Sequence, residues 1–455
     1  MPKHTATLGF ALTIAGAIVG AASCGLDTAT PSPVEAGVVD AAPPPLESAP
    51  PAIIPEEQRK DATSSPVIFD TERGRVWTAN GDVGSVSFVD IDAPRVLAEI
   101  GIGKDIRSVA LSPDFKWLAA VDRDGAKVVL VDAETRVVKR AIALGTHPRA
   151  AVWDAANPRF LYVAVEDDDA VAVIDRTLGV LVDTIKVGRL PSGVAVSRLR
   201  PELYAVHRID GKVTIVDTAT RKALVDVVLE NQAADPDPKV PQGRPFAFET
   251  LAWAPSGIEA WLGHELIAPT RPFQFQSTVF PAVSVIDLSP LRLEVATDPV
   301  TGTIQGRKLL FDAINLPDPT ANATIVSQPC AAAIHPNGIA AYVLACGSED
   351  LLVFDVLSGR AVDILRDLPG DHPTGIALDE KGDRAFLLAD QSHTLARVDL
   401  AGGSVIKHVR LLGAPIPLVA KDPVDPELRE GLKLFYRASS RKGELATTGN
   451  DWMSC

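Results

Sequence analysis

The stretch Val171-Ala172-Val173-Ile174-Asp175 alternates apolar side chains along a short segment and ends in a carboxylate. The same pattern recurs along the 455-residue chain as SFVD, VLVD, TIVD, SVID, LVFD and ARVD. A repeat of roughly forty residues is typical of propellers and solenoids, because one unit alone cannot bury both faces of its sheet. The seven copies predict seven repeated units, whose closing aspartates are Asp90, Asp132, Asp175, Asp217, Asp287, Asp355 and Asp399.

Each repeat contains four predicted strands. In the third copy these strands cover 149–153, 160–165, 170–174 and 179–187. Successive side chains of a strand point to opposite faces of a sheet, so apolar residues at every position indicate a sheet that is covered on both sides. The sequence therefore predicts an all-β fold, a seven-bladed β-propeller of four-stranded antiparallel blades, over residues 64–417.

The recurring aspartates are followed by turn residues, as in Asp132-Ala133-Glu134-Thr135. A short carboxylate at this position can accept hydrogen bonds from the backbone N–H groups just ahead and hold a tight hairpin. We interpret these aspartates as turn caps and not as catalytic groups.

Two intervals between the aspartates are longer than the others. They contain segments rich in Pro, Asp and Gln at 230–243, 265–281 and 314–328, which predict loops inserted on one side of the ring. The blades are expected to begin near Pro66, Arg107, Pro148, Pro191, Pro245, Pro329 and Pro373.

The third copy, LYVAVEDDDAVAVIDRTLGVLVDTIKVG at 161–188, resembles the YVTN family of β-propellers, and the resemblance extends over the predicted ring. It implies the propeller fold. It says little about function, because this fold hosts binding proteins, lactonases and oxidoreductases.

Loops that precede the first strand of a blade and loops that follow the second strand surround one mouth of a propeller's channel. Several polar side chains of this chain occupy those positions. We therefore expect a ligand or an envelope protein to bind at this mouth. The candidate ligand-binding residues are Asn80, His147, His207, His264, His372 and Asp390.

These histidines could also be metal ligands, of which a site needs three or four. Only His207 and His264 come from adjacent blades, and no HxH or HxxxH spacing supports them. We expect no metal site, with mouth-lining polar residues as the simpler interpretation. The sequence also lacks a Ser-His-Asp arrangement, a nucleophile elbow and a phosphate-binding glycine loop, so no catalytic residue is assigned.

Cys330 and Cys346 flank a predicted hairpin and should lie on neighbouring antiparallel strands. Opposed positions on such strands come close enough for a disulfide, which an oxidising compartment would preserve. Two buried thiols are the alternative.

Residues 1–24 are typical of an export signal, with Lys3 before an apolar stretch at 8–19. The segment that ends at Cys24 resembles a bacterial lipobox, in which the cysteine thiol is lipidated, although Ala21 stands where leucine is usual. A conventional signal peptide cleaved nearby is the alternative. Residues 25–63 are rich in Pro and Ala and predict a disordered tether. We expect a periplasmic or outer-membrane lipoprotein of a Gram-negative bacterium, attached to the membrane by lipid alone.

The tail, 418–455, contains a predicted helix at 427–436 with apolar Leu428, Leu432 and Phe435. The sequence EGLKLFYRASSRKGELATTGNDWMSC resembles the lead-in of a c-type cytochrome domain of the di-haem cytochrome c peroxidase or MauG class. The matching positions are Gly431, Leu434, Phe435, Ser454 and Cys455.

Covalent haem needs a second cysteine and an axial histidine after the first cysteine. The given chain ends at Cys455, so we expect the truncated start of such a domain and no cofactor in the chain as given. Haem c and a redox partner are expected only if the sequence continues. A chance acidic helix with a terminal cysteine is the alternative.

The chain carries a formal charge of −14 without a cluster of lysines or arginines, which argues against nucleic-acid binding. No apolar run long enough to span a membrane follows residue 24. The preferred hypothesis is a binding or scaffold module of the cell envelope, coupled in its complete form to a c-type cytochrome. The alternative is a propeller enzyme, either a lactonase-like hydrolase or a haem- or quinone-linked dehydrogenase, with its site at the channel mouth.

Overall fold

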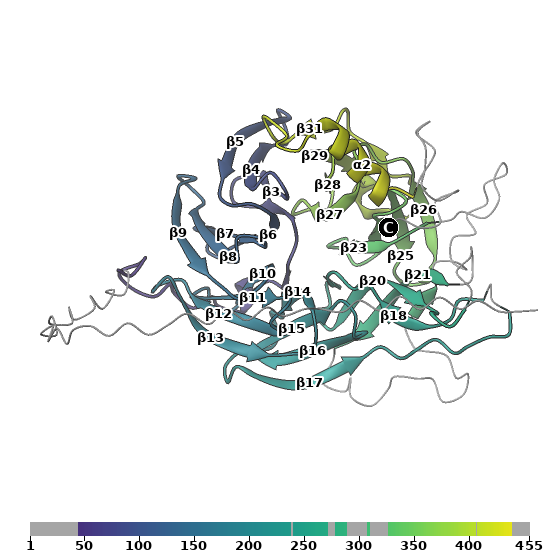
Figure 1. Ribbon diagram of the computed structural model, residues 1–455, viewed down its shortest axis with the longest axis horizontal. Coiled ribbons are helices and arrows are strands. Elements are labelled where there is room, and N and C mark those ends of the chain that lie inside the picture. Colours follow the sequence, from purple (N-terminus) through teal and green to yellow (C-terminus); the bar gives the residue numbers. More distant parts are fainter. Residues whose placement is uncertain are drawn as a thin grey trace, which may run out of the picture. The chain divides into compact units, whose positions relative to one another are not determined.

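The computed structural model describes residues 44–237, 240–271, 278–288, 307–309, 326–405 and 407–438. From Pro44 onward the chain belongs to one compact unit. Within it, seven antiparallel sheets follow one another around a ring (Figure 1). The predicted seven-bladed propeller of four-stranded blades is confirmed.

In each blade the strands run in sequence order from the channel outward. Blades one to three consist of β2 (Val67–Asp70), β3 (Arg75–Asn80), β4 (Ser85–Asp90), β5 (Arg95–Gly101); β6 (Ile106–Leu111), β7 (Trp117–Asp122), β8 (Lys127–Asp132), β9 (Val138–Ala143); β10 (Pro148–Trp153), β11 (Phe160–Val165), β12 (Ala170–Asp175) and β13 (Val180–Lys186).

Blades four and five consist of β14 (Pro191–Val196), β15 (Glu202–His207), β16 (Lys212–Asp217), β17 (Lys222–Val228); β18 (Arg244–Phe246), β19 (Ala252–Trp253), β20 (Glu259–Ile267), β21 (Val279–Asp287) and β22 (Arg307–Leu309). Blades six and seven consist of β23 (Pro329–Ile334), β24 (Ala340–Ala345), β25 (Asp350–Asp355), β26 (Ala361–Leu365); β27 (Pro373–Leu378), β28 (Arg384–Ala389), β29 (Thr394–Asp399), β30 (Arg410–Leu411) and β31 (Ile416–Pro417).

The alternating pattern distributes each blade's side chains between two neighbours. In β12, Ala172 and Ile174 pack into a cluster shared with blade two, whereas Val171 and Val173 pack into a cluster shared with blade four. The described part of the chain contains seven such clusters, each between two adjacent blades. The ring closes in the same way, because Val67 of blade one and Phe386 of blade seven share one cluster. No strand of blade one joins the sheet of blade seven within the described residues.

The recurring aspartates cap turns, as predicted. Asp132, for example, accepts hydrogen bonds from the N–H groups of Glu134 (3.1 Å) and Thr135 (2.8 Å). Asp287 lies next to residues that the structure does not describe. The other aspartates that accept such bonds are Asp90, Asp175, Asp217, Asp355 and Asp399.

Blade five departs from the predicted boundaries. Its second strand, β20, does not end at His264 but continues to Ile267 and pairs with β21 along the full length of both strands. Part of the predicted insertion at 265–281 therefore lengthens a hairpin. The predicted insertion at 314–328 lies mostly outside the described residues.

The described end of the predicted tether lies against the blades instead of being disordered. The N–H groups of Leu46 and Glu47 donate to the carbonyl of Thr177, at 2.8 and 3.2 Å. The Glu47 carboxylate pairs with Arg176 at 3.1 Å. The side chain of Arg176 is only 1% exposed and also pairs with Asp114 at 2.6 Å, so Glu47 completes a buried cluster of ion pairs that holds this end of the segment on the blades. A short 3₁₀ helix, η1 (Glu56–Gln58), lies in this segment.

The chain then crosses the channel. The strand β1 (Ala62–Thr63) pairs with β14 of blade four, and Ser65 forms a bridge with Val109 of blade two. The carbonyl of Pro66 accepts the N–H of Ala79 in blade one, at 2.8 Å. Blades one and four lie on opposite sides of a seven-membered ring, so residues 62–66 span the channel between them (Figure 1).

The helix α2 (Pro426–Tyr436) confirms the helix predicted in the tail, and Asp425 caps its first turn. The side that faces the propeller is polar. Arg429 is buried, whereas Leu428 and Phe435 are 60% and 50% exposed. Two of the three apolar positions named in the sequence, Leu428 and Phe435, are therefore exposed. Ser454 and Cys455 lie outside the described residues.

Candidate functional site

The innermost strand of five blades carries a β-bulge at its second residue. The register shifts by one residue in β6, β10, β14, β23 and β27. A bulge turns its extra residue out of the ladder, and here each extra side chain lines the channel. These residues are Arg107, Arg149, Ser192, Cys330 and Thr374.

Blade five also turns a side chain toward the channel, although its inner strand β18 is short. Ala247 has a positive φ of 60° two residues before Glu249, just as His147, with a φ of 55°, precedes Arg149. Glu249 therefore occupies the channel-facing position of its blade and lines the same space.

Together these side chains surround a cavity of about 340 Å³ in the channel. Ser64, Ser65 and Pro66 of the crossing segment form one side of it, and Tyr436 of α2 forms another. The ring of Tyr436 stacks on that of His372, with 4.3 Å between centroids. The cavity thus lies between the crossing segment and the C-terminal helix.

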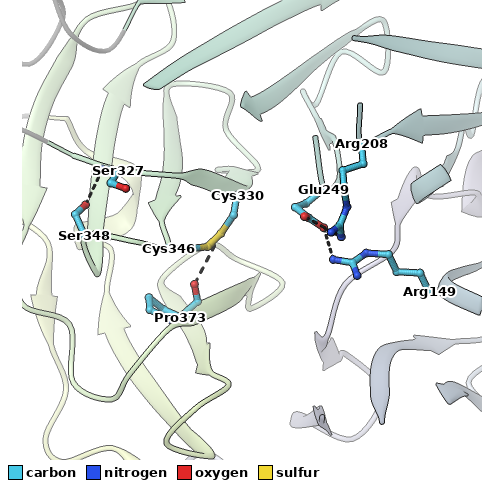
Figure 2. The surroundings of a disulfide bond; sticks show 8 residues. All are labelled: Arg149, Arg208, Glu249, Ser327, Cys330, Cys346, Ser348 and Pro373. Carbon is cyan, nitrogen blue, oxygen red and sulfur yellow. Dashed lines mark hydrogen bonds and ion pairs between the residues drawn. A yellow bond between two sulfur atoms is a disulfide. The ribbon is translucent and has the colours of Figure 1, made fainter. Parts of the chain in front are cut away.

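Arginines and carboxylates alternate along the wall formed by blades two to five. Arg149 and Arg208 both donate to Glu249, at 2.6 and 3.2 Å, as Figure 2 shows. Glu166 lies 3.4 Å from Arg208 and 3.5 Å from Arg123. The wall is therefore a connected ionic network contributed by four different blades.

The charges of this network are set by burial and by the neighbours. Burial raises the pKa of Glu249, but Arg149 and Arg208 outweigh it and hold this pKa below its ordinary value. Burial lowers the pKa of Arg107, yet Asp390 and Asp105 more than offset this and raise it. The cavity consequently keeps Glu249 ionised near pH 7 and favours the charged form of Arg107, whereas burial lowers the pKa of Arg208.

The opposite wall contains the cysteine pair. Cys330 and Cys346 form a disulfide in the structure, the first of the two alternatives that the sequence left open. Figure 2 shows this disulfide, close to Pro373, facing the group formed by Arg149, Arg208 and Glu249. Both cysteines line the cavity.

Two of the six candidate residues line the cavity, namely His372 and Asp390. Burial lowers the pKa of His372, so its imidazole is neutral near pH 7. Its Nδ1 atom is buried without a hydrogen-bond partner. Asp390 acts on Arg107 across the cavity.

His207 and His264 are fully buried between strands and do not line the cavity. Nε2 of His207 lies 2.8 Å from the Thr214 hydroxyl, and Nε2 of His264 lies 2.8 Å from the Ser284 hydroxyl. Burial, reinforced by the charge of Lys212, lowers the pKa of His207 to about 4. Both histidines tie neighbouring strands together.

Asn80 and His147 are also away from the cavity lining. The Asn80 amide donates to the hydroxyls of Ser85 and Ser87, at 2.8 and 2.9 Å. His147 pairs with Asp167 at 2.5 Å on the surface. Neither residue faces the space where a ligand of the channel would lie.

The arginines of the cavity were missed at the sequence level, although a signal for them exists. Aligning the repeats places Arg149, Ser192, Cys330 and Thr374 directly after the proline that begins each blade. In this chain the charged residue at that repeat position, Arg149, lines the channel, whereas His207 and His264 at the predicted ends of second strands do not. What the repeat cannot show is that the position is a bulge.

In the described part of the chain, no group of three or more His, Cys, Asp or Glu side chains is placed to hold a metal ion. Within the same ranges, no helix combines the length and apolar character needed to cross a bilayer.

Several solved structures share this fold. Hydrazine synthase of Kuenenia stuttgartiensis has a TM-score of 0.60 and 16% identity, over 74% of this chain and 96% of that chain. The β-propeller domain of Cps50 (Swd1) of Myceliophteria thermophila has a TM-score of 0.52 and 15% identity, over 72% and 93%. U3-55K has a TM-score of 0.51 and 15% identity, over 77% and 94%. Identities this low show the fold alone.

Neither a protein-family model nor the sequence of a curated protein matches this chain. The YVTN resemblance of the ring and the cytochrome resemblance of the tail therefore stay predictions.

The disulfide generates a prediction about stability. The double variant C330A/C346A should lower the free energy of unfolding by about 3 kcal/mol, because the bridge closes a short loop and restricts the unfolded chain. Urea denaturation followed by tryptophan fluorescence measures this. Dithiothreitol should lower the midpoint of the wild type and leave that of the double variant unchanged. Alkylation of both cysteines in denatured, unreduced protein would contradict the bridge.

The docking of α2 should depend on pH. Arg429 lies among Asp422 (2.7 Å), Asp82 (2.8 Å) and His393 (3.0 Å). The hydrogen bond from Arg429 lowers the pKa of Asp422. Because the pKa of Asp422 is lower in the folded state than in the unfolded state, its ion pair stabilises the docked helix at pH values above the ordinary aspartate pKa of about 3.9. This contribution is lost as the pH falls through the lowered pKa of the folded state.

The protection of the α2 amides against hydrogen exchange, measured relative to the intrinsic exchange rate at the same pH, should therefore fall below about pH 4. Burial lowers the pKa of His393. When His393 is protonated at low pH, its positive charge beside Arg429 also destabilises the docked helix. R429Q should show fast exchange already at pH 7, while the exposed control K421Q should not. Protection of α2 equal to that of the blades at pH 2 would contradict this account.

Proposed function

We propose that this chain is an exported, lipid-anchored β-propeller that binds a small molecule in its channel as a binding module of the cell envelope. The observation that carries the proposal is the cavity of about 340 Å³, lined by polar and charged side chains from most of the blades. Ligand sites of proteins are concave, usually 300–1,000 Å³ in volume, and contain a few convergent polar groups. The channel cavity has these properties.

The arrangement of the two chain segments supports the same function. The crossing segment at 62–66 borders the cavity on one side, and Tyr436 with His372 borders it on another, so the space is concave and partly covered. A partly covered polar space suits a small molecule better than a protein partner, which needs an interface of about 800 Å² on each side.

The enzyme alternative receives less support. It required His207 or His264 beside carboxylates in one pocket, and both imidazoles face neighbouring strands. His372 and Asp390 do share the cavity, but Nδ1 of His372 has no hydrogen-bond partner in the described chain, so no second group orients this imidazole as a general base. Binding is therefore the function that this geometry favours.

The proposed coupling to a c-type cytochrome rests on the resemblance of the tail. Gly431, Leu434 and Phe435 belong to α2, which lies beside the cavity through Tyr436. A haem module that follows α2 in a longer chain would begin next to the channel mouth. Such a position would allow ligand binding in the channel to influence electron transfer.

Filling the cavity should abolish ligand binding. T374W places a large side chain at the channel-facing position of blade seven, whereas the control T184W lies on the exposed outer strand β13. In a thermal-unfolding screen of neutral, cationic and anionic small metabolites, at least one compound should raise the midpoint of the wild type and of T184W but not of T374W. Equal shifts in all three proteins, or no shift with any compound, would refute binding in the channel.

The anchor has a separate test. C24S should move the protein from the membrane fraction to the soluble periplasmic fraction and remove labelling by radioactive palmitate, because the thiol is the proposed site of lipid attachment. Expression in a Gram-negative host followed by fractionation measures both effects. A wild-type protein that carries no palmitate would rule out the lipid anchor and leave the channel proposal standing.

A further inference from the structure

The surface of the cavity differs in charge from the chain as a whole. The chain has a formal charge of −14. Among the described residues that line the cavity, however, four are arginines and two are carboxylates, Glu249 and Asp390. Behind this lining, Asp105 pairs with Arg107, and Glu166 pairs with Arg123 and Arg208, so the excess of arginines is confined to the surface that a ligand would meet. The arginines are Arg107, Arg123, Arg149 and Arg208.

The guanidinium groups also retain unused donors. An arginine has five N–H donors. Arg107 uses Nε to donate to Asp105 at 2.8 Å, and its two terminal nitrogens make no hydrogen bond to any described residue. Nε of Arg208 is buried and faces the Glu166 carboxylate at 3.4 Å, so it is Arg107 that presents free terminal donors. Internal carboxylates therefore orient these side chains without saturating them.

The rest of the wall is mostly uncharged. The disulfide, Pro66 and the stacked rings of His372 and Tyr436 supply apolar surface. Hydroxyl-bearing residues, among them Thr374, also line the cavity. One side of the cavity thus suits an oxyanion, and the other suits a short carbon skeleton.

We propose that the channel cavity binds a small organic anion, whose carboxylate or phosphate oxygens accept hydrogen bonds from Arg107 together with Arg149 and Arg208. The planar guanidinium fork binds both kinds of oxyanion in pairs of parallel hydrogen bonds. This inference rests on the proposed function and names the class of ligand. Arg107 is the key residue, because its terminal donors are the ones left without a protein partner.

Isothermal titration calorimetry of the full chain with three probes tests this proposal. The probes are succinate, inorganic phosphate and succinamide, the uncharged diamide with the carbon skeleton of succinate. At least one of the two anions should bind, and its affinity should fall as the salt concentration rises. R107M should weaken this binding at least tenfold, and R107K should weaken it less. The control R95M, on the outer strand β5, should bind like the wild type.

Each outcome is decisive. Binding of succinate alone assigns the carboxylate as the binding group, and binding of phosphate alone assigns the phosphate. Binding of neither anion, or equal anion binding by R107M, overturns the proposal. If succinamide binds as well as succinate, the anion assignment fails while small-molecule binding in the channel stands. Circular dichroism and the unfolding midpoint of R107M without ligand distinguish a lost donor from a lost fold.

Discussion

The structure depends on the burial of both faces of each blade. In β12, consecutive side chains enter two different apolar clusters, one shared with blade two and one with blade four. A blade removed from its neighbours would expose both faces, so each sheet is stable only between two others. The same constraint closes the ring, because blades seven and one pack as any other pair does. Because side-chain packing closes the ring, blades one and seven do not need to share a strand.

This packing leaves few positions free for function. Residues in the middle of a strand are committed to one of the two clusters, and the outer strands face solvent. The second residue of an innermost strand is different, because a bulge takes it out of the alternation and turns it toward the channel. Evolution can vary this position without disturbing an interface between blades. In this chain it holds two arginines, a glutamate and a half-cystine as well as hydroxyl residues.

Charge decides how the two ends of the described chain are placed. The buried Arg176 draws Glu47 onto the blades, and the buried Arg429 holds α2 against the loops of blades one and seven. A buried guanidinium is costly unless it is paired, so these ion pairs help to fix both segments, in addition to the packing of Leu46 against the cluster of blades two and three. The helix therefore docks through Arg429, Lys433 and Tyr436, which lie four and three residues apart on one side, whereas Leu428 and Phe435 face outward.

The sequence by itself determined the number of blades, nearly all strand boundaries, the role of the recurring aspartates and the C-terminal helix. These features follow from local rules, namely alternation with a period of two, turn chemistry and helix capping, which act within a few residues. His207 and His264 show the limit of such rules, because ending a second strand does not decide whether a side chain points into the channel or between strands. The convergence of Arg107, Arg149, Arg208 and Glu249, and the passage of residues 62–66 across the channel, join segments that are far apart in the chain. Only the tertiary structure decided them, because closing the ring is what places blades two to five around one common space.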